Sequence, residues 1–158
     1  MEIAAEIRES LGGEWIPVVY REKVRTQRTR SYHIIVPKKE NRADIFHTLL
    51  GIELKVGNYR FNCPDLSTAR YLRVFVRIGC QDVAIPYDIT KISTLADELE
   101  VALHKTLLLF EEKVSDKIAS ARGRMRANLI KEIRSEIEEI GAGALMPEFR
   151  QSTKQRDS

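Results

Sequence analysis

The stretch Ile52–Cys63, with the sequence IELKVGNYRFNC, predicts the centre of the fold. Apolar and charged residues alternate from Ile52 to Val56, which is the two-residue period of a half-buried strand. Gly57 and Asn58 interrupt this pattern, and it resumes at Tyr59. Both Gly and Asn tolerate positive φ, so the stretch predicts two strands joined by a tight hairpin.

A helix and another strand are predicted to follow this hairpin. Asp65 is expected to cap a helix that continues to Ile78, because an aspartate there can accept a hydrogen bond from a free amide of the first turn. Gly79 ends the helical pattern, and Asp82–Tyr87 predicts a strand. A strand, helix, strand order of this length implies a right-handed crossover and a parallel pair of strands.

The N-terminal part of the chain predicts a helix and further strands. Glu2–Leu11 has apolar residues every four positions, which is typical of an amphipathic helix. Glu14–Tyr20 is rich in β-forming residues and predicts an edge strand, since Pro17 cannot donate to a strand ladder. Ser31–Val36 predicts another strand. Ala43–Leu50 favours a short helix by its apolar spacing, with a strand that runs on into the hairpin as the alternative.

The last third of the chain predicts two long amphipathic helices. Thr94 and Asp97 resemble a capping box, and leucines recur on one face from there to about Val114. Ser115 is expected to cap a second helix, which ends at Gly141. Two such helices joined by a short break form an antiparallel hairpin or an extended arm.

The expected fold class is therefore α+β or mixed α/β, with a small mixed β-sheet, a crossover helix and a C-terminal pair of long helices. A chain of 158 residues fits one compact unit of this kind. Residues 1–92 are expected to form the mixed α/β core. Residues 93–142 are expected to be the helical pair, packed on the core or used for assembly, and residues 143–158 a disordered polar tail.

Composition excludes several classes of protein. No apolar run approaches the roughly 20 residues that a membrane span needs, so we expect no membrane association and a cytoplasmic location. Cys63 and Cys80 are too few for a disulfide framework and lack the spacing of a zinc site. Both cysteines are expected to be small buried residues.

Charge is unevenly distributed along a chain whose net formal charge is +3. Residues 21–42 carry eight basic and two acidic residues, a net charge of +6, whereas residues 93–114 carry five acidic and two basic residues, a net charge of −3. This asymmetry predicts a polyanionic partner, or a self-association in which the opposite charges meet.

The basic segment predicts contact with DNA or RNA. Arginine can bind a phosphate bidentately, and a cluster of arginines supplies affinity that falls with added salt. The alternative is a solvated loop that keeps an edge strand from aggregating. The candidate nucleic-acid contacts are Arg21, Lys23, Arg25, Arg28, Arg30 and Arg42. The stripe of Arg70, Arg73 and Arg77 would extend this surface if it faces the same side, and is otherwise a solvated helix face.

Glu53 and Lys55 form the pattern that indicates catalysis. Residues two apart on a strand project from the same face, where a carboxylate can bind Mg²⁺ and a lysine can steady an attacking water or a phosphate charge. This E-x-K pattern, with the order helix, three strands, helix, strand, resembles the PD-(D/E)XK nuclease superfamily. The resemblance implies a Mg²⁺-dependent phosphodiesterase with Glu53, Lys55 and Asp44 in its active site. It also implies a metal ligand on the first helix, Glu9 or Glu6. The alternative is an exposed ion pair.

The apolar stripes of the two C-terminal helices are most simply the other half of the core. If they project instead, a stripe of that length needs a partner, and a homodimer or larger assembly is expected. The leading function is nucleic-acid binding, with Mg²⁺-dependent hydrolysis as its catalytic form. The alternative is a non-catalytic protein-interaction or assembly module that acts through these helices.

Overall fold

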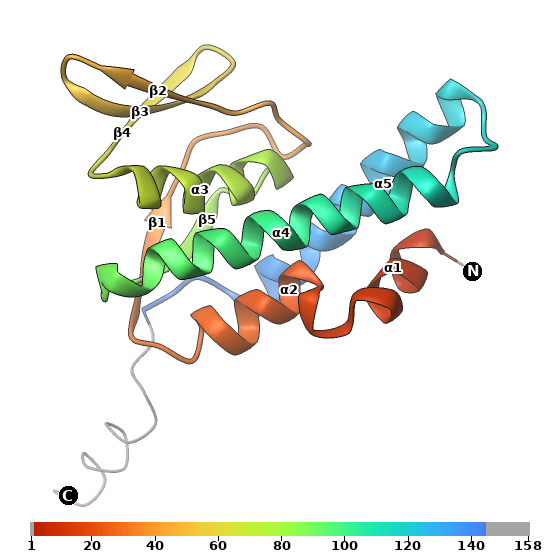
Figure 1. Ribbon diagram of the computed structural model, residues 1–158, viewed down its shortest axis with the longest axis horizontal. Coiled ribbons are helices and arrows are strands. Elements are labelled where there is room, and N and C mark those ends of the chain that lie inside the picture. Colours follow the sequence, from red (N-terminus) through yellow and green to blue (C-terminus); the bar gives the residue numbers. More distant parts are fainter. Residues whose placement is uncertain (1, 145–158) are drawn as a thin grey trace, which may run out of the picture.

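The computed structural model describes residues 2–144 and has the α+β class that the sequence predicts. Two small antiparallel sheets and several helices pack around one central helix, α3 (Leu66–Ile78) (Figure 1). In chain order the elements are α1 (Ile3–Leu11), the 3₁₀ turn η1 (Gly12–Glu14), α2 (Ile16–Val19), the π-helical turn η2 (Tyr20–Val24), β1 (Thr29–His33), β2 (Asp44–Thr48), β3 (Gly51–Val56), β4 (Tyr59–Cys63), α3, β5 (Asp82–Pro86), α4 (Ile89–Lys113) and α5 (Ala119–Ile140).

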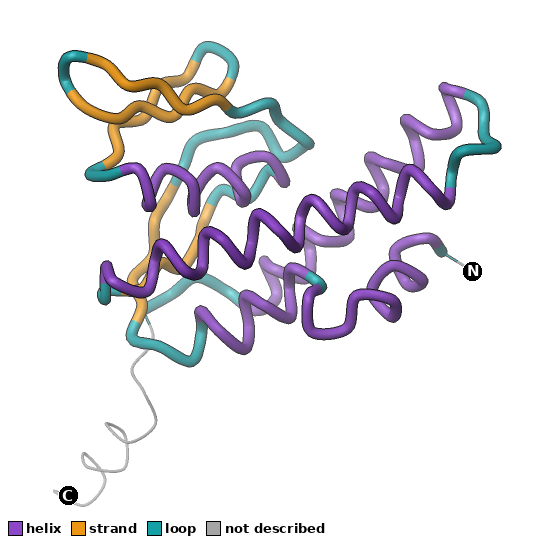
Figure 2. Tube along the Cα trace, in the orientation of Figure 1, coloured by secondary structure: helices purple, strands orange, loops and turns teal. Residues whose placement is uncertain are grey.

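Helix α3 lies between the three-stranded sheet and the long helix α4. The antiparallel sheet β2–β3–β4 covers one side of α3, α4 crosses its other side, and α5 runs behind (Figures 1 and 2). α1 and α2 pack against both α4 and α5. Because α3 is enclosed in this way, its buried residues surround most of the helix rather than forming one narrow stripe.

The predicted hairpin and the predicted caps of α3 are confirmed. Gly57 has a φ of 59°, which suits a two-residue hairpin with glycine at its first central position. The Oδ1 atom of Asp65 accepts a hydrogen bond of 2.7 Å from the backbone N–H of Thr68. Gly79 ends the helix in the left-handed region, at a φ of 90°. Each of these features depends on residues that are close together in the sequence, so the local sequence is sufficient to predict it.

The predicted parallel pair and the single mixed sheet are wrong. β5 pairs antiparallel with β1, whereas β4 belongs to the other sheet. Ala84 of β5 hydrogen bonds to side chains instead of a further strand: its N–H donates to the Tyr20 hydroxyl at 3.0 Å, and its carbonyl accepts from the Tyr71 hydroxyl at 2.6 Å. The strand predicted at Ser31–Val36 is shifted and lies at Thr29–His33.

The predicted edge strand Glu14–Tyr20 is wrong, because this segment is helical. Trp15, Ile16, Val19 and Tyr20 are buried, and their spacing of one and then three residues places them on one helical face. Pro17 occupies the first turn of α2. A backbone N–H in that turn has no partner within the helix, so the lack of an N–H in proline costs no hydrogen bond. The β-forming residues of this segment therefore pack into the core from a helix and not from a strand.

The predicted short helix Ala43–Leu50 is also wrong, and the segment forms strand β2 and the turn that joins it to β3. Its apolar residues do not make a core-facing stripe, since Leu49 and Leu50 are fully exposed. The hydroxyl of Thr48 organises the turn: it accepts from Leu50 N at 3.1 Å and donates to Gly51 O at 3.1 Å. Residue-by-residue pairing with β3 stabilises this strand.

The predicted C-terminal pair of long helices is confirmed with different starting residues. α4 begins at Ile89, because Asp88 accepts a hydrogen bond from Thr90 N, so the capping box predicted at Thr94 lies inside the helix. Ser115 lies in the turn before α5 and does not cap it. The predicted end of α5 at Gly141 is confirmed. Most of the tail predicted to be disordered, residues 145–158, lies outside the described residues.

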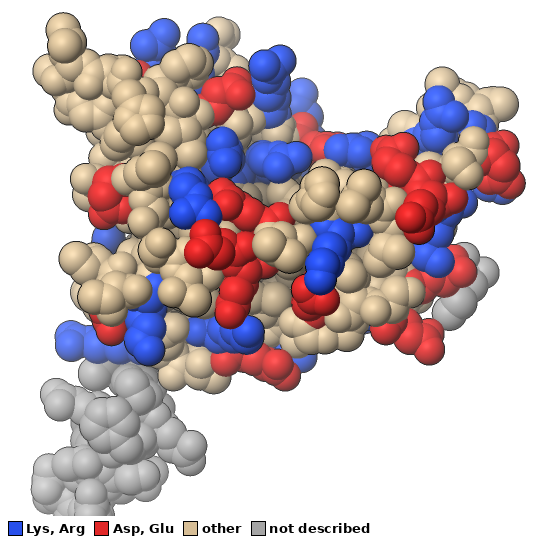
Figure 3. Space-filling model, in the orientation of Figure 1, with Lys and Arg blue, Asp and Glu red and all other residues tan. Residues whose placement is uncertain are grey.

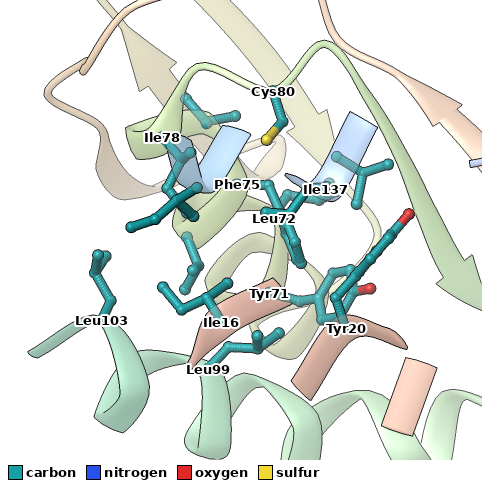
Figure 4. Close-up of a cluster of buried hydrophobic side chains, with 14 of the residues drawn as sticks. Ile16, Tyr20, Tyr71, Leu72, Phe75, Ile78, Cys80, Leu99, Leu103 and Ile137 are labelled. Carbon is teal, nitrogen blue, oxygen red and sulfur yellow. The ribbon is translucent and has the colours of Figure 1, made fainter. Parts of the chain in front are cut away.

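Aromatic residues fill the centre of the core (Figure 4). The ring of Phe75 lies 5.5 Å from that of Tyr20 in an edge-on arrangement and 5.1 Å from that of Tyr71. Both cysteines are buried as predicted, and burial raises the pKa of the Cys80 thiol to about 12 and that of the Cys63 thiol to about 11. Neither thiol is therefore ionised near neutral pH.

Three segments meet at Gly79. A Cβ atom at this position would lie closer to the Lys39 backbone than atoms can approach. On another side, Nη1 of the buried Arg134 donates to the Ile78 carbonyl at 2.9 Å. A cation is favoured there because the helix dipole places partial negative charge at the end of α3.

We expect the variants Tyr20→Phe and Tyr71→Phe to lower the free energy of unfolding by about 1–3 kcal/mol each, because each leaves a buried backbone group of Ala84 without a partner. The effect at Tyr20 should be the larger, since its hydroxyl also donates to Gly141 O at 2.7 Å. Urea unfolding measures both. Tyr59→Phe, at a half-exposed position on β4, is the control and should change little. An equal loss in all three variants would contradict this role of the two buried hydroxyls.

We expect Gly79→Ala to destabilise the protein by about 2 kcal/mol or more, since left-handed backbone strain alone costs about 1–2 kcal/mol and the new methyl group would collide with Lys39. Gly123→Ala is the matched control. Gly123 lies within α5 with open space around its Cα, so this change should stabilise the protein by up to about 1 kcal/mol. Thermal unfolding should therefore show shifts of opposite sign, and a neutral Gly79→Ala would refute the close approach.

Candidate functional site

The predicted basic segment, residues 21–42, does not form one surface. It passes through η2 and β1 and then through the loop that leads to β2. Arg21 is exposed on η2, whereas Arg42 is exposed in the loop just before β2, an edge strand of the three-stranded sheet. The six predicted contacts are therefore distributed over different parts of the molecule.

Two of the predicted contacts are engaged within the protein. Nζ of Lys23 lies 3.0 Å from a carboxylate oxygen of Glu98 on α4. Nη1 of Arg25 donates to Oγ1 of Thr29 at 3.0 Å and to the carbonyl of Gly143 at 2.7 Å. Arg25 thereby joins the start of β1 to the chain that follows α5, which is a structural role.

Two other predicted contacts, Arg28 and Arg30, lie exposed over tyrosine rings. The guanidinium carbon of Arg28 is 4.8 Å from the ring centroid of Tyr87, and that of Arg30 is 5.9 Å from the ring centroid of Tyr32. Antiparallel pairing of β1 and β5 brings the first pair together, since Tyr87 N donates to Arg28 O at 3.1 Å. We name Arg28, Arg30, Tyr32 and Tyr87 the Arg–Tyr surface.

The tyrosines of the Arg–Tyr surface were not among the predicted site residues. One signal was present: Arg30 and Tyr32 are two residues apart, so on a strand they share a face. Tyr87 could not be assigned in this way, because its neighbour Arg28 is remote in sequence and the parallel pairing expected for β5 would have placed it elsewhere.

The arginine stripe of α3 is largely neutralised by the acidic face of α4. Arg70 donates to Asp97 and, at 2.6 Å, to Glu100, and Arg73 reaches Glu100 at 3.3 Å. Figure 3 shows basic and acidic side chains side by side in the middle of the face that it presents. The negative segment predicted from the sequence is thus paired with basic residues of the same chain.

Asp44, Glu53 and Lys55 share the outer face of the three-stranded sheet. In the register of β2 and β3, Asp44 lies directly opposite Lys55, and Phe46 lies opposite Glu53. Asp44 and Glu53 are therefore diagonal neighbours, a spacing of roughly 7–8 Å in an antiparallel sheet. The structure brings the two predicted strand carboxylates and the lysine together on one face.

Each of these carboxylates has an arginine partner. Asp44 lies 3.3 Å from Nε of Arg42, and Glu53 lies 3.5 Å from Nη1 of Arg60. The Glu53 side chain is only 17% exposed, whereas that of Arg60 is 63% exposed. Within residues 2–144, Lys55 has no carboxylate within 4 Å. The cluster is thus a row of alternating charges in which the lysine is free.

The predicted ligand on the first helix does not join this cluster. Glu9 lies on α1, which packs on α4 and α5 at the end of the molecule remote from the three-stranded sheet (Figure 1). Glu6 lies on the same helix, 4.0 Å from Nζ of Lys113. Among residues 2–144, no three His, Cys, Asp or Glu side chains are grouped so that they could hold a metal ion.

Most of the apolar stripe residues of α4 and α5 are buried within the chain, whereas Ile118, just before α5, is 73% exposed. The core includes Leu95, Leu99 and Leu103 of α4 and Ile133 and Ile137 of α5. These core residues are therefore not available to a second copy of the chain, and the homodimer stays a prediction. Across the described part of the chain, no helix is long and apolar enough to cross a membrane.

Comparison of the chain with protein-family models, with curated proteins and with solved structures gave no match. The resemblance to PD-(D/E)XK nucleases therefore rests on Glu53, Lys55 and Asp44 alone. The two candidate sites of this protein are accordingly defined by their own geometry: the Arg–Tyr surface at β1 and the charged outer face of β2–β3–β4.

Proposed function

We propose that this protein binds nucleic acid through the Arg–Tyr surface. The observation that carries the proposal is the position of two exposed arginines over two tyrosine rings, with guanidinium carbons 4.8 and 5.9 Å from the ring centroids. Such cation–π contacts favour this position of the guanidinium, while its N–H groups remain able to donate to phosphate oxygens. Exposed Arg21, on the neighbouring turn η2, supplies further positive charge.

The exposed ring of Tyr87 favours a single-stranded ligand, whereas the ring of Tyr32 is partly buried. Tyr87 is 51% exposed, so part of its surface remains available to a base. Proteins that bind single strands commonly combine phosphate-binding cations with aromatic platforms, on which each stacked base contributes about 1–3 kcal/mol. The unstacked bases of single-stranded DNA or RNA can reach such rings, whereas the bases of a duplex are already stacked.

We expect the double variant Arg28→Ala/Arg30→Ala to weaken binding to a single-stranded oligonucleotide and to flatten its salt dependence. Each lost phosphate contact should reduce the slope of log K against log salt by about 0.7. Fluorescence anisotropy over a range of salt concentrations measures both quantities. Tyr87→Leu should reduce affinity for the single strand by about tenfold through lost stacking, and duplex affinity much less.

The matched control is Arg124→Ala/Lys131→Ala, which removes the same charge from exposed positions on α5. It should leave the salt slope unchanged. Equal losses in the two double variants would mean that net charge alone attracts the ligand, and unchanged binding by Arg28→Ala/Arg30→Ala would end the proposal.

A second candidate is a Mg²⁺-dependent phosphodiesterase at the outer face of the three-stranded sheet. The observation that favours it is the placement of Asp44 and Glu53 as diagonal neighbours, with Lys55 opposite Asp44. Mg²⁺ is commonly bound by one or two carboxylates together with substrate phosphates, so these two residues would hold the ion. Arg42 and Arg60 would then release the carboxylates and turn toward the phosphate.

For this second candidate we expect Glu53→Gln to abolish Mg²⁺-dependent cleavage, because an amide is a much poorer ligand than a carboxylate. Lys55→Met should abolish turnover while folding and metal binding persist. The assay is cleavage of single- and double-stranded DNA and RNA with Mg²⁺ or Mn²⁺, and Glu9→Gln, on the remote helix α1, is the control without effect. Absence of cleavage by the wild type, with stability shifts of at most about 1 kcal/mol in both variants, would identify a structural ion pair.

A further inference from the structure

A basic pocket lies where the loop of residues 37–43 crosses the C-terminal half of α3. It is an open cavity of about 580 Å³, lined by Glu40, Asn41, Arg42, Ala43, Arg73 and Arg77. Three arginines and one glutamate give this lining a net formal charge of +2. The pocket is separate from the Arg–Tyr surface, which lies at the paired ends of β1 and β5.

The charged groups of the pocket differ in what they already bind. The carboxylate of Glu40 is held by two hydrogen bonds from Arg126, of 2.8 and 2.7 Å. Arg73 shares Glu100 with Arg70, at the longer distance of 3.3 Å. The Glu40 carboxylate thus forms its ion pair with Arg126, and among residues 2–144 it forms none with the arginines of the pocket.

Arg77 is the cation for which the described protein provides no partner. Within residues 2–144, no carboxylate lies within 4 Å of its guanidinium and no acceptor hydrogen bonds to it. Burial lowers the pKa of Arg77; Glu40 opposes this shift, and the charges of Arg73 and Arg126 add to it. Arginine nevertheless stays protonated at any physiological pH. The positive charge of Arg77 would therefore be compensated by a bound anion and not by loss of a proton.

The walls of the pocket are held in place before any ligand binds. Backbone N–H of Asn41 donates to the carbonyl of Arg77 at 3.0 Å, and its side-chain amide donates to the carbonyl of Val76 at 3.1 Å. The same loop lies against Gly79, where a side chain would not fit. A preformed site loses little conformational entropy on binding.

We propose that this pocket binds a phosphate group, which Arg77 and Arg73 contact from α3 and Arg42 contacts from the loop. The planar fork of each guanidinium matches the oxygens of a phosphate, and a tetrahedral dianion can accept from several such groups at once. The phosphate belongs to the end or backbone of a nucleic acid or to a free phosphorylated molecule. The proposal does not depend on the Arg–Tyr surface, because the pocket has its own cations.

The first experiment titrates the full chain with inorganic phosphate at constant ionic strength, by calorimetry or by NMR shifts of arginine side chains. The wild type should bind saturably, and Arg77→Met should bind about tenfold more weakly, the loss expected when one charge-assisted contact is removed. Arg42→Met, at an exposed loop position, should also weaken binding. Arg124→Met is the matched control and should bind as the wild type does.

Thermal unfolding of each variant establishes that it is folded, and Arg77→Lys provides a second test at the same position, since it keeps the charge and removes the fork. That variant should bind phosphate more weakly than the wild type. No saturable binding by the wild type, or an equal loss in Arg124→Met, would overturn the proposal.

The second experiment distinguishes the sources of the phosphate. Two oligonucleotides of one sequence, with a 5′-phosphate or a 5′-hydroxyl, compete with inorganic phosphate for the pocket. Preferential displacement by the phosphorylated strand identifies a terminal phosphate, equal displacement identifies the backbone, and no displacement identifies a free phosphorylated molecule. Arg28→Ala/Arg30→Ala should leave the affinity for inorganic phosphate unchanged, so failure at one surface is distinguishable from failure at the other.

Discussion

The backbone of Ala84 sets the constraint on which much of this structure depends. β5 lies in the core and pairs with one strand only, so its remaining N–H and C=O groups must find other partners or incur a desolvation cost. Tyr20 and Tyr71 meet this requirement with their hydroxyl groups. Since Tyr20 also donates to Gly141, the same interaction joins η2, α3, β5 and the end of α5. The rings of these tyrosines pack on Phe75, so one cluster satisfies the polar groups and fills the centre of the core.

Enclosure of α3 by a sheet on one side and long helices on the other has a second consequence. Only a narrow strip of the helix remains for polar residues, and three arginines occupy it. Arg70 and Arg73 find carboxylates on α4, because that helix crosses the first part of the strip. Arg77 lies beyond the crossing, under the loop of residues 37–43, where the carboxylate that lines the pocket, Glu40, is bound by Arg126. A uniform stripe in the sequence thus becomes two arginines that pair with α4 and one, Arg77, that has no carboxylate partner among residues 2–144.

The distribution of charge in the sequence and the distribution on the surface differ for the same reason. The acidic segment of α4 is matched against α3 and Lys23, so it presents little unbalanced negative charge. The basic segment loses Arg25 to a carbonyl and a hydroxyl group. The charged residues that remain exposed form three small groups. These are the Arg–Tyr surface, the pocket around Arg77 and the row of charges on the outer face of the three-stranded sheet. Binding of a polyanion by this protein would therefore depend on a few oriented arginines more than on a diffuse positive field.

Local signals determined part of this protein. The hairpin of residues 52–63 and the limits of α3 could be predicted because a positive-φ glycine, an aspartate cap and a left-handed glycine act within a few residues of the chain. The shared face of Glu53 and Lys55 follows from strand geometry in the same way. Tertiary structure alone decided the partner of β5, the helical state of residues 16–24 and the strand at residues 44–48, since each depends on neighbours distant in sequence. It also decided which arginines lack an ion-pair partner, because these ion pairs require a carboxylate from another element. The local sequence around an arginine does not indicate which helix will pack against it.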